Sequence, residues 1–149
     1  MTHKIAIAGA SGRMGQMLMD AVRAADDCVL SGALDMAGSP AIGTDAGASS
    51  GQPTGVVIAS DLRQGLKDSQ VLIDFTRPEG TLAHLKVCRE LGVNAVIGTT
   101  GFTDAQKAEI AEAAKDIAIM MAPNMSVGVN VTLKLLEMAA KAMATGYDI

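Results

Sequence analysis

Short apolar runs alternate along the chain with longer segments in which apolar residues recur every three or four positions. The short runs predict β-strands at residues 4–8, 29–34, 56–59, 71–75, 95–97 and 117–121. The longer segments predict helices at residues 13–25, 61–67, 77–91, 104–115 and 129–144. Because strands and helices alternate throughout, we expect an α/β fold with a Rossmann-like, doubly wound and mostly parallel sheet. The strand order expected for such a sheet is 3-2-1-4-5-6.

Two of the predicted helices begin with a capping signal. Thr76 and Glu79 form a T-x-x-E capping box with Pro78 in the first turn, and Thr103 with Gln106 repeats the pattern. Two other helices have an apolar stripe at helical spacing. We interpret the stripe of the first of these helices as core packing. The stripes are Met14, Leu18, Ala21, Val22 and Ala25 in the first helix, and Val129, Leu133, Leu136, Ala140 and Met143 in the last.

Residues 36–55 interrupt the alternation. Five glycines and two prolines fall within this stretch, which predicts a long loop without regular structure. Loops of this length are often functional. At the other end of the chain, residues 147–149 resemble the start of a further strand, so we expect the natural chain to continue.

The composition limits the classes of function. The chain has 149 residues, 49% of them hydrophobic, which is enough to form the core of one ordinary domain. A net charge of −4 and 2% aromatic residues argue against nucleic-acid binding, which requires a basic face and usually stacking aromatics. No apolar run approaches the roughly 20 residues of a membrane span, and no signal-peptide pattern is present. We therefore expect a cytoplasmic protein without a membrane partner.

The cysteines and histidines match no metal or disulfide pattern. Cys28 and Cys88 lie far apart without a partner motif, so we interpret them as free thiols in a reducing compartment. His3 and His84 are not at metal-ligand spacing from other residues, and we interpret both as structural or surface residues. No zinc pattern or P-loop lysine occurs either, and we expect no metal site.

Three glycines follow the first predicted strand at intervals of three residues. The G-x-x-G-x-x-G spacing of Gly9, Gly12 and Gly15 is a variant of the dinucleotide-binding fingerprint G-x-G-x-x-G. In that motif the first glycine makes the turn, the second allows a pyrophosphate to approach, and the third packs the helix on the sheet. Asp35 ends the second strand twenty residues after Gly15, where a carboxylate accepts hydrogen bonds from an adenosine ribose. The stretch therefore predicts a dinucleotide site.

The carboxyl ends of the other strands are also small or polar. They are expected to meet at the crevice where the strand order reverses, which is where ligands bind in this fold. Asp74 is one of these residues, and we interpret it as orienting a loop, because no second carboxylate is paired with it. With no nucleophile arrangement in the sequence, hydride transfer by a bound cofactor is the leading chemistry.

Four strings in the sequence resemble the dihydrodipicolinate reductase family of lysine and diaminopimelate biosynthesis. They are A-G-A-S-G-R-M-G at residues 8–15, I-D-F-T-R-P-E-G-T at residues 73–81, G-T-T-G-F at residues 98–102 and N-M-S-V-G-V-N at residues 124–130. The resemblance implies an oxidoreductase that transfers a hydride from NADH or NADPH to a small cyclic dicarboxylate, with loss of a hydroxyl group as water. It also implies a cytoplasmic homotetramer of two-domain subunits. Residues 1–123 would be the dinucleotide-binding domain, and residues 124–149 the hinge and first helix of an α+β substrate domain.

The resemblance also assigns roles to residues by position. The pyrophosphate contacts would be Gly9, Ala10, Ser11, Gly12, Arg13 and Met14, and Asp35 would hold the adenosine ribose. Thr100 would additionally reach a carboxylate of the substrate. Along the nicotinamide half of the cofactor would lie Gly98, Thr99, Thr100, Ala122, Pro123, Asn124 and Met125.

Two departures from the family pattern affect the expected function. Members that use both cofactors often have a basic residue after the ribose acid, whereas Met36 follows Asp35 here, which favours NADH over NADPH. The family's H-H-x-x-K motif, with its catalytic histidine pair and lysine, is absent from the 149 residues and is expected beyond Ile149. We therefore expect the chain to bind dinucleotide without turning over substrate.

Two alternative functions remain open at the level of the sequence. A non-catalytic, regulatory NAD(P)-binding Rossmann module also fits the composition and the missing catalytic groups. A dehydrogenase acting on a semialdehyde is a second alternative, but it requires a nucleophilic cysteine. Cys88 lies in the middle of a predicted helix among Leu85, Val87 and Leu91, which is unfavourable for that role.

Overall fold

The computed structural model describes residues 1–146. Residues 147–149, where the sequence predicts the start of a further strand, lie outside the described residues. None of the helices in the described part is long and apolar enough to cross a membrane.

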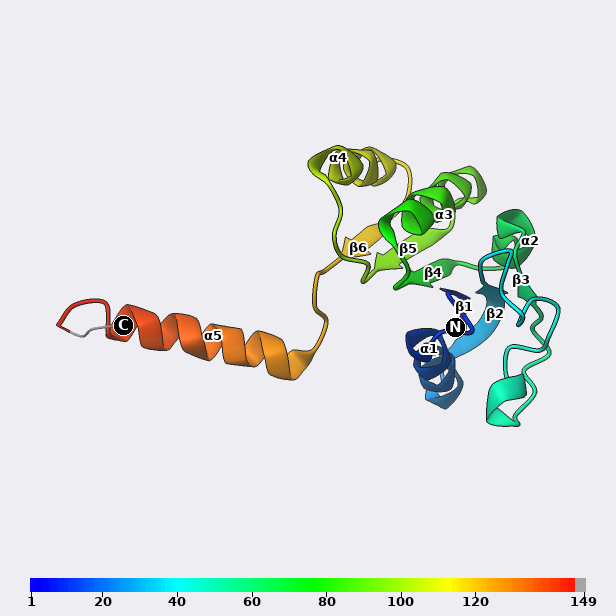
Figure 1. Ribbon diagram of the computed structural model, residues 1–149, viewed down its shortest axis with the longest axis horizontal. Helices are drawn as coiled ribbons and strands as arrows, with labels where there is room; N and C mark the ends of the chain where they lie inside the picture. Colours follow the sequence, from blue (N-terminus) through cyan, green and yellow to red (C-terminus); the bar gives the residue numbers. More distant parts are fainter. Residues whose placement is uncertain (147–149) are drawn as a thin grey trace.

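Six parallel strands form the sheet at the centre of the molecule (Figure 1). Their order is β3-β2-β1-β4-β5-β6, which confirms the expected doubly wound topology with its reversal between β1 and β4. All carboxyl ends therefore lie at the same edge. The strands are β1 (His3–Ala8), β2 (Cys28–Leu34), β3 (Ile58–Ala59), β4 (Val71–Asp74), β5 (Asn94–Ile97) and β6 (Ile119–Met121).

Helices cover both faces of this sheet. On one face, Leu66, Leu85 and Ile110 of α2, α3 and α4 pack against Ala6 and Ala8 of β1. On the other face α1 packs against Ile5 and Ile7, so successive residues of β1 point into different cores. The helices are α1 (Arg13–Ala24), α2 (Leu62–Leu66), α3 (Pro78–Leu91), α4 (Asp104–Ala113) and α5 (Val127–Ala142), with a 3₁₀ turn, η1, at Ala48–Ser50.

The predicted loop between β2 and β3 covers the rest of the α1 face. Its Ala46 is buried against the sheet, and the Asp45 carboxylate holds its shape by accepting hydrogen bonds from three backbone amides and the Thr54 hydroxyl. β3 is shorter than the predicted strand 56–59, because only Ile58 and Ala59 pair with β2. Val56 and Ile58 also form backbone hydrogen bonds with Ala46 and Thr44 of the loop.

The two predicted capping boxes have different outcomes. The box of Thr103 and Gln106 is confirmed, with both reciprocal hydrogen bonds present at the start of α4. The box of Thr76 and Glu79 is wrong, because α3 begins after Arg77 and that residue makes no side-chain cap. The Thr76 hydroxyl instead donates to Asp74 Oδ1 at 2.6 Å, and is therefore not available to the helix.

The predicted stripe of α1 is only partly correct. Val22 is buried as expected, but the other fully buried positions of the helix are Gly15 and Met19, and Met14 is 46% exposed. The buried face begins at Gly15, where the helix lies close to the strand. Met19 and Val22, four and seven positions later, lie on the same side of the helix and therefore also face the sheet. The prediction of a helix is confirmed, but the face of the helix that is buried differs from the predicted one.

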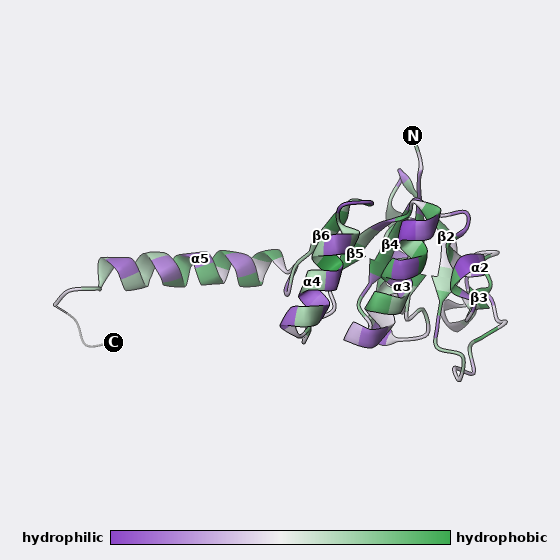
Figure 2. Ribbon diagram, turned by 90° about the horizontal axis from the view of Figure 1, so that it is seen from above, coloured by the Kyte–Doolittle hydropathy of each residue, from purple (hydrophilic) through white to green (hydrophobic). Residues whose placement is uncertain are grey.

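The last helix, α5, projects away from the sheet (Figures 1 and 2). It forms at Val127–Ala142, slightly earlier than predicted, and the Ser126 hydroxyl caps it by accepting from the Val129 amide. All of its side chains are exposed, including Leu133 and Leu136 of the predicted apolar stripe. The predicted helix is confirmed, and within residues 1–146 its apolar stripe is exposed to solvent.

Candidate functional site

The glycine turn has the conformation that its spacing predicts. Gly9 adopts a φ of +69°, which side chains disfavour, and the Gly12 amide donates to its carbonyl at 2.9 Å. A Cβ at Gly15 would overlap the Gly9 carbonyl oxygen, so the start of α1 can approach β1 only through a glycine. The turn is therefore a backbone cradle at a helix N-terminus, an arrangement that favours phosphate groups.

Asp35 is tied directly to this turn. Its Oδ2 accepts from the Ser11 amide at 3.0 Å, and its Oδ1 accepts from the Met36 amide at 2.8 Å. Partial burial acts to raise the pKa of Asp35, but these hydrogen bonds outweigh it and hold the pKa below the usual value. The carboxylate is thus ionised and fixed at the end of β2, as the sequence predicts for the ribose position.

A cleft of about 670 Å³ opens at the carboxyl ends of β1, β2 and β4. It brings Gly9 and Asp35 together with residues from the turns after β3 and β4. Its size is in the range of small-molecule sites, which are about 300–1,000 Å³. It is lined by Gly9, Asp35, Met36, Ala37, Ser60, Leu62, Phe75, Thr76, Arg77, Glu79, Gly80, Ala83 and His84.

Most of the residues lining the cleft were not predicted as site residues from the sequence. Thr76 and Arg77 belong to the family-like string, but their pattern indicated only a helix cap. Arg77, Gly80 and His84 follow one another at spacings of three and four, so one face of α3 turns toward the cleft. This spacing is the signal in the sequence that would have identified His84.

Asp74 organises the floor of the site from a buried position. The side chain is 1% exposed, and its Oδ1 accepts from both the amide and the hydroxyl of Thr76. His84 Nδ1 lies 2.7 Å from Oδ2. Burial acts to raise the pKa of Asp74, but the hydrogen bond and charge of His84 and the bonds from Thr76 lower it overall. The residue orients a loop, as the sequence analysis inferred.

The segment 98–100 places its two threonines differently. Thr99 is 4% exposed, and its hydroxyl accepts from Thr81 Oγ1 at 2.9 Å, so its side chain points into the molecule. Only its backbone remains for the cofactor contact predicted for this residue. Thr100 is exposed at the edge of the sheet. A Cβ at Gly98 would overlap the Phe75 ring, so this glycine is needed for the packing of that ring.

Residues 122–125 follow β6 at the same edge of the sheet. The Ala122 amide donates to the Ile97 carbonyl at 3.2 Å, which continues the pairing with β5. Asn124 Oδ1 accepts from the Ser126 amide, so this side chain takes part in the turn into α5. Pro123 and Asn124 are exposed. None of these residues lines the cleft beside Asp35.

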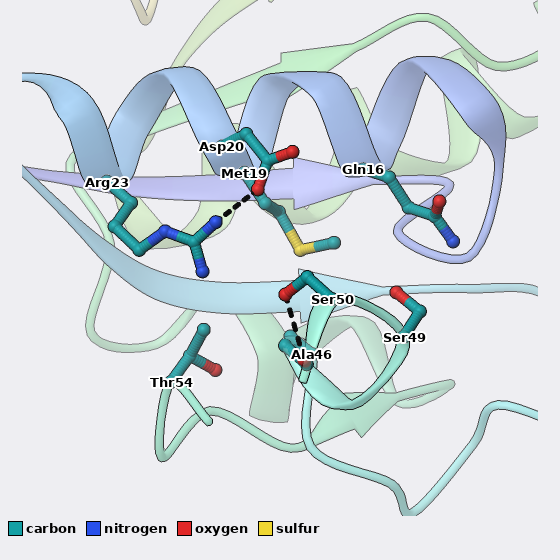
Figure 3. A pocket seen from close by; sticks show the side chains of 9 residues that line it. Gln16, Met19, Asp20, Arg23, Ala46, Ser49, Ser50 and Thr54 are labelled. Atoms are coloured by element: carbon teal, nitrogen blue, oxygen red, sulfur yellow. Dashed lines mark hydrogen bonds and ion pairs between the residues drawn. The ribbon is translucent and has the colours of Figure 1, made fainter. Parts of the chain in front are cut away.

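A second hollow lies between α1 and the β2–β3 loop (Figure 3). It holds about 70 Å³, roughly a tenth of the volume of the cleft, and is therefore too small for a nucleotide. Arg23 is one of its lining residues and forms an ion pair with Asp20 on the same helix. This hollow contributes nothing to the candidate site.

The thiols give no support to a cysteine nucleophile. Cys28 and Cys88 are both free, as predicted. Burial, with a smaller effect from the charge of Asp74, raises the pKa of Cys88 to about 12, and this residue is fully buried. The structure therefore disfavours the semialdehyde dehydrogenase alternative. Within residues 1–146, no group of three or more potential ligands is placed to hold a metal ion.

Comparison with known proteins decides the family. The family described as "Dihydrodipicolinate reductase, N-terminus" matches residues 3–125. The chain belongs to this family. A 4-hydroxy-tetrahydrodipicolinate reductase from Herminiimonas arsenicoxydans is 65% identical over 146 residues, covering 98% of this chain and 54% of the relative. A reductase of the same name from Burkholderia pseudomallei is 59% identical over 146 residues, covering 98% of this chain and 55% of that relative.

One solved structure agrees with the assignment to the dihydrodipicolinate reductase family, and a second shares the fold. The dipicolinate-bound dihydrodipicolinate reductase from Paenisporosarcina sp. TG-14 has a TM-score of 0.75 and 27% identity, covering 94% of this chain and 54% of that protein. The WlbA dehydrogenase of Chromobacterium violaceum, solved with NADH and UDP-GlcNAcA, shares the fold alone, with a TM-score of 0.68 and 21% identity over 97% of this chain and 41% of that protein. The chain spans about half the length of the curated relatives.

Proposed function

We propose that the chain binds a nicotinamide adenine dinucleotide across the carboxyl ends of β1, β2 and β4. The observation that carries the proposal is the hydrogen bond from the Ser11 amide to Asp35, which joins the glycine turn to the carboxylate at the end of β2. In this fold a turn of that kind suits a phosphate and such a carboxylate suits a ribose. The cleft beside Asp35 then has the position and the size for the adenosine half. The backbone around Gly9–Met14 would hold the pyrophosphate.

We further propose that NADH is preferred to NADPH. The Asp35 carboxylate would repel a 2′-phosphate, and the next residue, Met36, is 75% exposed and supplies no cation. Binding of NADPH would therefore lack the charge compensation that a basic residue after the ribose acid provides.

The remaining predicted contacts extend the proposal to the nicotinamide half. Gly98, the Thr99 backbone, Thr100 and residues 122–125 all lie at the same sheet edge as the glycine turn. We propose that they flank the nicotinamide, which supplies the hydride when the cofactor is bound. The exposed Thr100 hydroxyl would donate to a carboxylate of the substrate. The relative solved with dipicolinate supports a small cyclic dicarboxylate as the class of substrate.

Residues 1–123 would then form the dinucleotide-binding domain, with residues 124–149 as hinge and first helix of a substrate domain. Support comes from α5, which projects away from the sheet and has all of its side chains exposed. Because the 149 residues contain no H-H-x-x-K motif, we propose that they do not reduce substrate on their own. Membership of a reductase family favours this interpretation over a regulatory module.

Calorimetric titration with NADH and NADPH tests the proposal. We expect NADH to bind more tightly to the unmodified chain, and Met36→Arg to improve NADPH binding about tenfold because the guanidinium pairs with the 2′-phosphate. Met17→Arg adds the same charge at an exposed position of α1 and is the matched control, expected to leave the preference unchanged. Tighter binding of NADPH by the unmodified chain would refute the preference, and no binding of either would refute the function.

A further inference from the structure

Thr81 lies inside α3, but its hydroxyl group bonds to a different element. A threonine hydroxyl in a helix commonly donates back to the carbonyl four residues earlier, which here belongs to Arg77. That carbonyl accepts the backbone amide of Thr81, whereas the Thr81 hydroxyl donates to Thr99 Oγ1 at 2.9 Å. Thr81 is 1% exposed and Thr99 is 4% exposed. The bond therefore joins α3 to the segment after β5 in the interior of the molecule.

The buried Asp74 gives this bond a single direction. Thr99 Oγ1 lies 3.5 Å from both the carbonyl oxygen and Oδ1 of Asp74. The carbonyl oxygen and the ionised carboxylate can only accept, so the Thr99 hydroxyl turns its hydrogen toward Asp74 and offers a lone pair to Thr81. The three residues form one chain of hydrogen bonds that runs from Thr81 through Thr99 to Asp74.

The segment after β5 is also tied to the end of β4. The Gly98 amide donates to the Asp74 carbonyl at 2.9 Å, and the Phe75 ring packs where a Cβ of Gly98 would lie. Thr81 adds a tie from α3 to these two. With Gly98 and Thr99 held from inside, the next residue, Thr100, is exposed. The buried contacts thus set the position of a backbone segment whose outer side faces solvent.

We propose that Thr81 is a positioning residue for the nicotinamide half of the site, because its hydroxyl holds Thr99 against Asp74 and so fixes the backbone of residues 98–100. Thr81 does not line the cleft beside Asp35 and reaches the site only through Thr99. A segment that is already held in place loses less conformational entropy when a ligand binds to it. The inference rests on the proposed binding of a dinucleotide.

The test compares NADH with ADP-ribose, which lacks the nicotinamide, by calorimetric titration. We expect the unmodified chain to bind NADH more tightly, because only the nicotinamide would contact residues 98–100. Thr81→Val removes the hydroxyl at nearly the same volume, and we expect it to weaken NADH binding about fivefold while the affinity for ADP-ribose stays unchanged. A role of Thr81 in stability alone would leave the ratio of the two affinities as it is in the unmodified chain.

Three further variants identify the hydroxyl as the cause. Thr99→Val breaks the same bond from its other side and is expected to give the same selective loss, which provides a second measurement if Thr81→Val does not fold. Thr81→Ser keeps a hydroxyl at this position and is expected to retain the ratio of the unmodified chain. Thr132→Val removes an exposed hydroxyl of α5, which donates to the Gly128 carbonyl, and should change neither affinity. Circular dichroism verifies that each variant is folded.

The outcomes separate this inference from the proposed function. An unchanged ratio of affinities in folded Thr81→Val or Thr99→Val would overturn the inference. Equal affinities of the unmodified chain for NADH and ADP-ribose would also overturn it, because residues 98–100 would then add nothing to binding. Both results leave dinucleotide binding intact, whereas no binding of either ligand to the unmodified chain would overturn the inference and the proposed function together.

Discussion

Single residues at the carboxyl edge of the sheet set the geometry of the site. Gly9 turns the chain after β1, and Gly15 lets α1 approach the turn. Asp35 closes the arrangement by accepting from Ser11. Each of these roles follows from local chemistry that the sequence displays, which is why the spacing of the glycines and the position of the acid were sufficient to predict them.

Gly15 should tolerate no side chain. In Gly15→Ala the new Cβ would overlap the Gly9 carbonyl oxygen and push α1 off the strand, so we expect a loss of about 1–3 kcal/mol in the free energy of unfolding. Urea denaturation measures this. Gly38→Ala is the matched control, because nothing lies within 4 Å of that position, and its stability should be nearly unchanged. An equally stable Gly15→Ala would contradict the close approach of helix and strand.

Asp74 should stabilise the fold in a pH-dependent way. Because its pKa in the folded chain lies below the usual 3.8, its contribution is complete above about pH 4 and is lost as the pH falls through the folded-state pKa. We expect Asp74→Asn to lower the free energy of unfolding by about 2 kcal/mol at pH 7, and by less near pH 3. Urea denaturation at the two pH values measures the difference.

A control for Asp74 is available on the surface. Asp68 is exposed, so Asp68→Asn should change stability little at either pH. A loss in Asp74→Asn that is equally large at both pH values would indicate packing rather than ionisation as its cause.

At the scale of elements, the sequence predicted the order and type of every β-strand and α-helix that the structure describes, but not the 3₁₀ turn η1. It failed where a tertiary contact competes with a local pattern. Thr76 matches a helix cap, but Asp74 takes its hydroxyl, and the sequence pattern alone contains no sign of that competition. Residues 56–59 match a strand, but only Ile58 and Ala59 pair with β2, and the folded loop forms hydrogen bonds with Val56 and Ile58. The role of His84 depends on how α3 lies against β4, which periodicity does not specify.

The helix α5 differs from the other elements in its energetic role. Leu136 is 60% exposed on it, whereas Leu72 of β4 is 1% exposed in the core. We expect Leu72→Ala to cost about 2–5 kcal/mol of the free energy of unfolding, because it leaves a cavity. Leu136→Ala should cost no more than about 0.5 kcal/mol, because it removes no packed contact. Thermal and urea denaturation of both variants measure this, and a large cost for Leu136→Ala would show that α5 packs against the sheet or another chain.

On the scale of the whole molecule, the sheet gathers one functional edge from segments far apart in the chain. Four of the predicted site segments lie there because all six strands are parallel, and the reversal of order between β1 and β4 opens the cleft. The family assignment and the position of the cleft both support the proposed binding of a dinucleotide. The substrate half of the site stays a prediction, since its expected catalytic residues are not among the 149 residues.

The most direct test of the central claim is a two-dimensional amide NMR titration of the chain with NADH. Binding across the glycine turn and the cleft predicts large shift changes at Ser11, Gly12, Asp35 and Thr76, with smaller ones at Thr100. The amides of α5 and of the hollow between α1 and the β2–β3 loop should not move. Changes confined to other faces of the sheet, or no changes at millimolar NADH, would contradict the account.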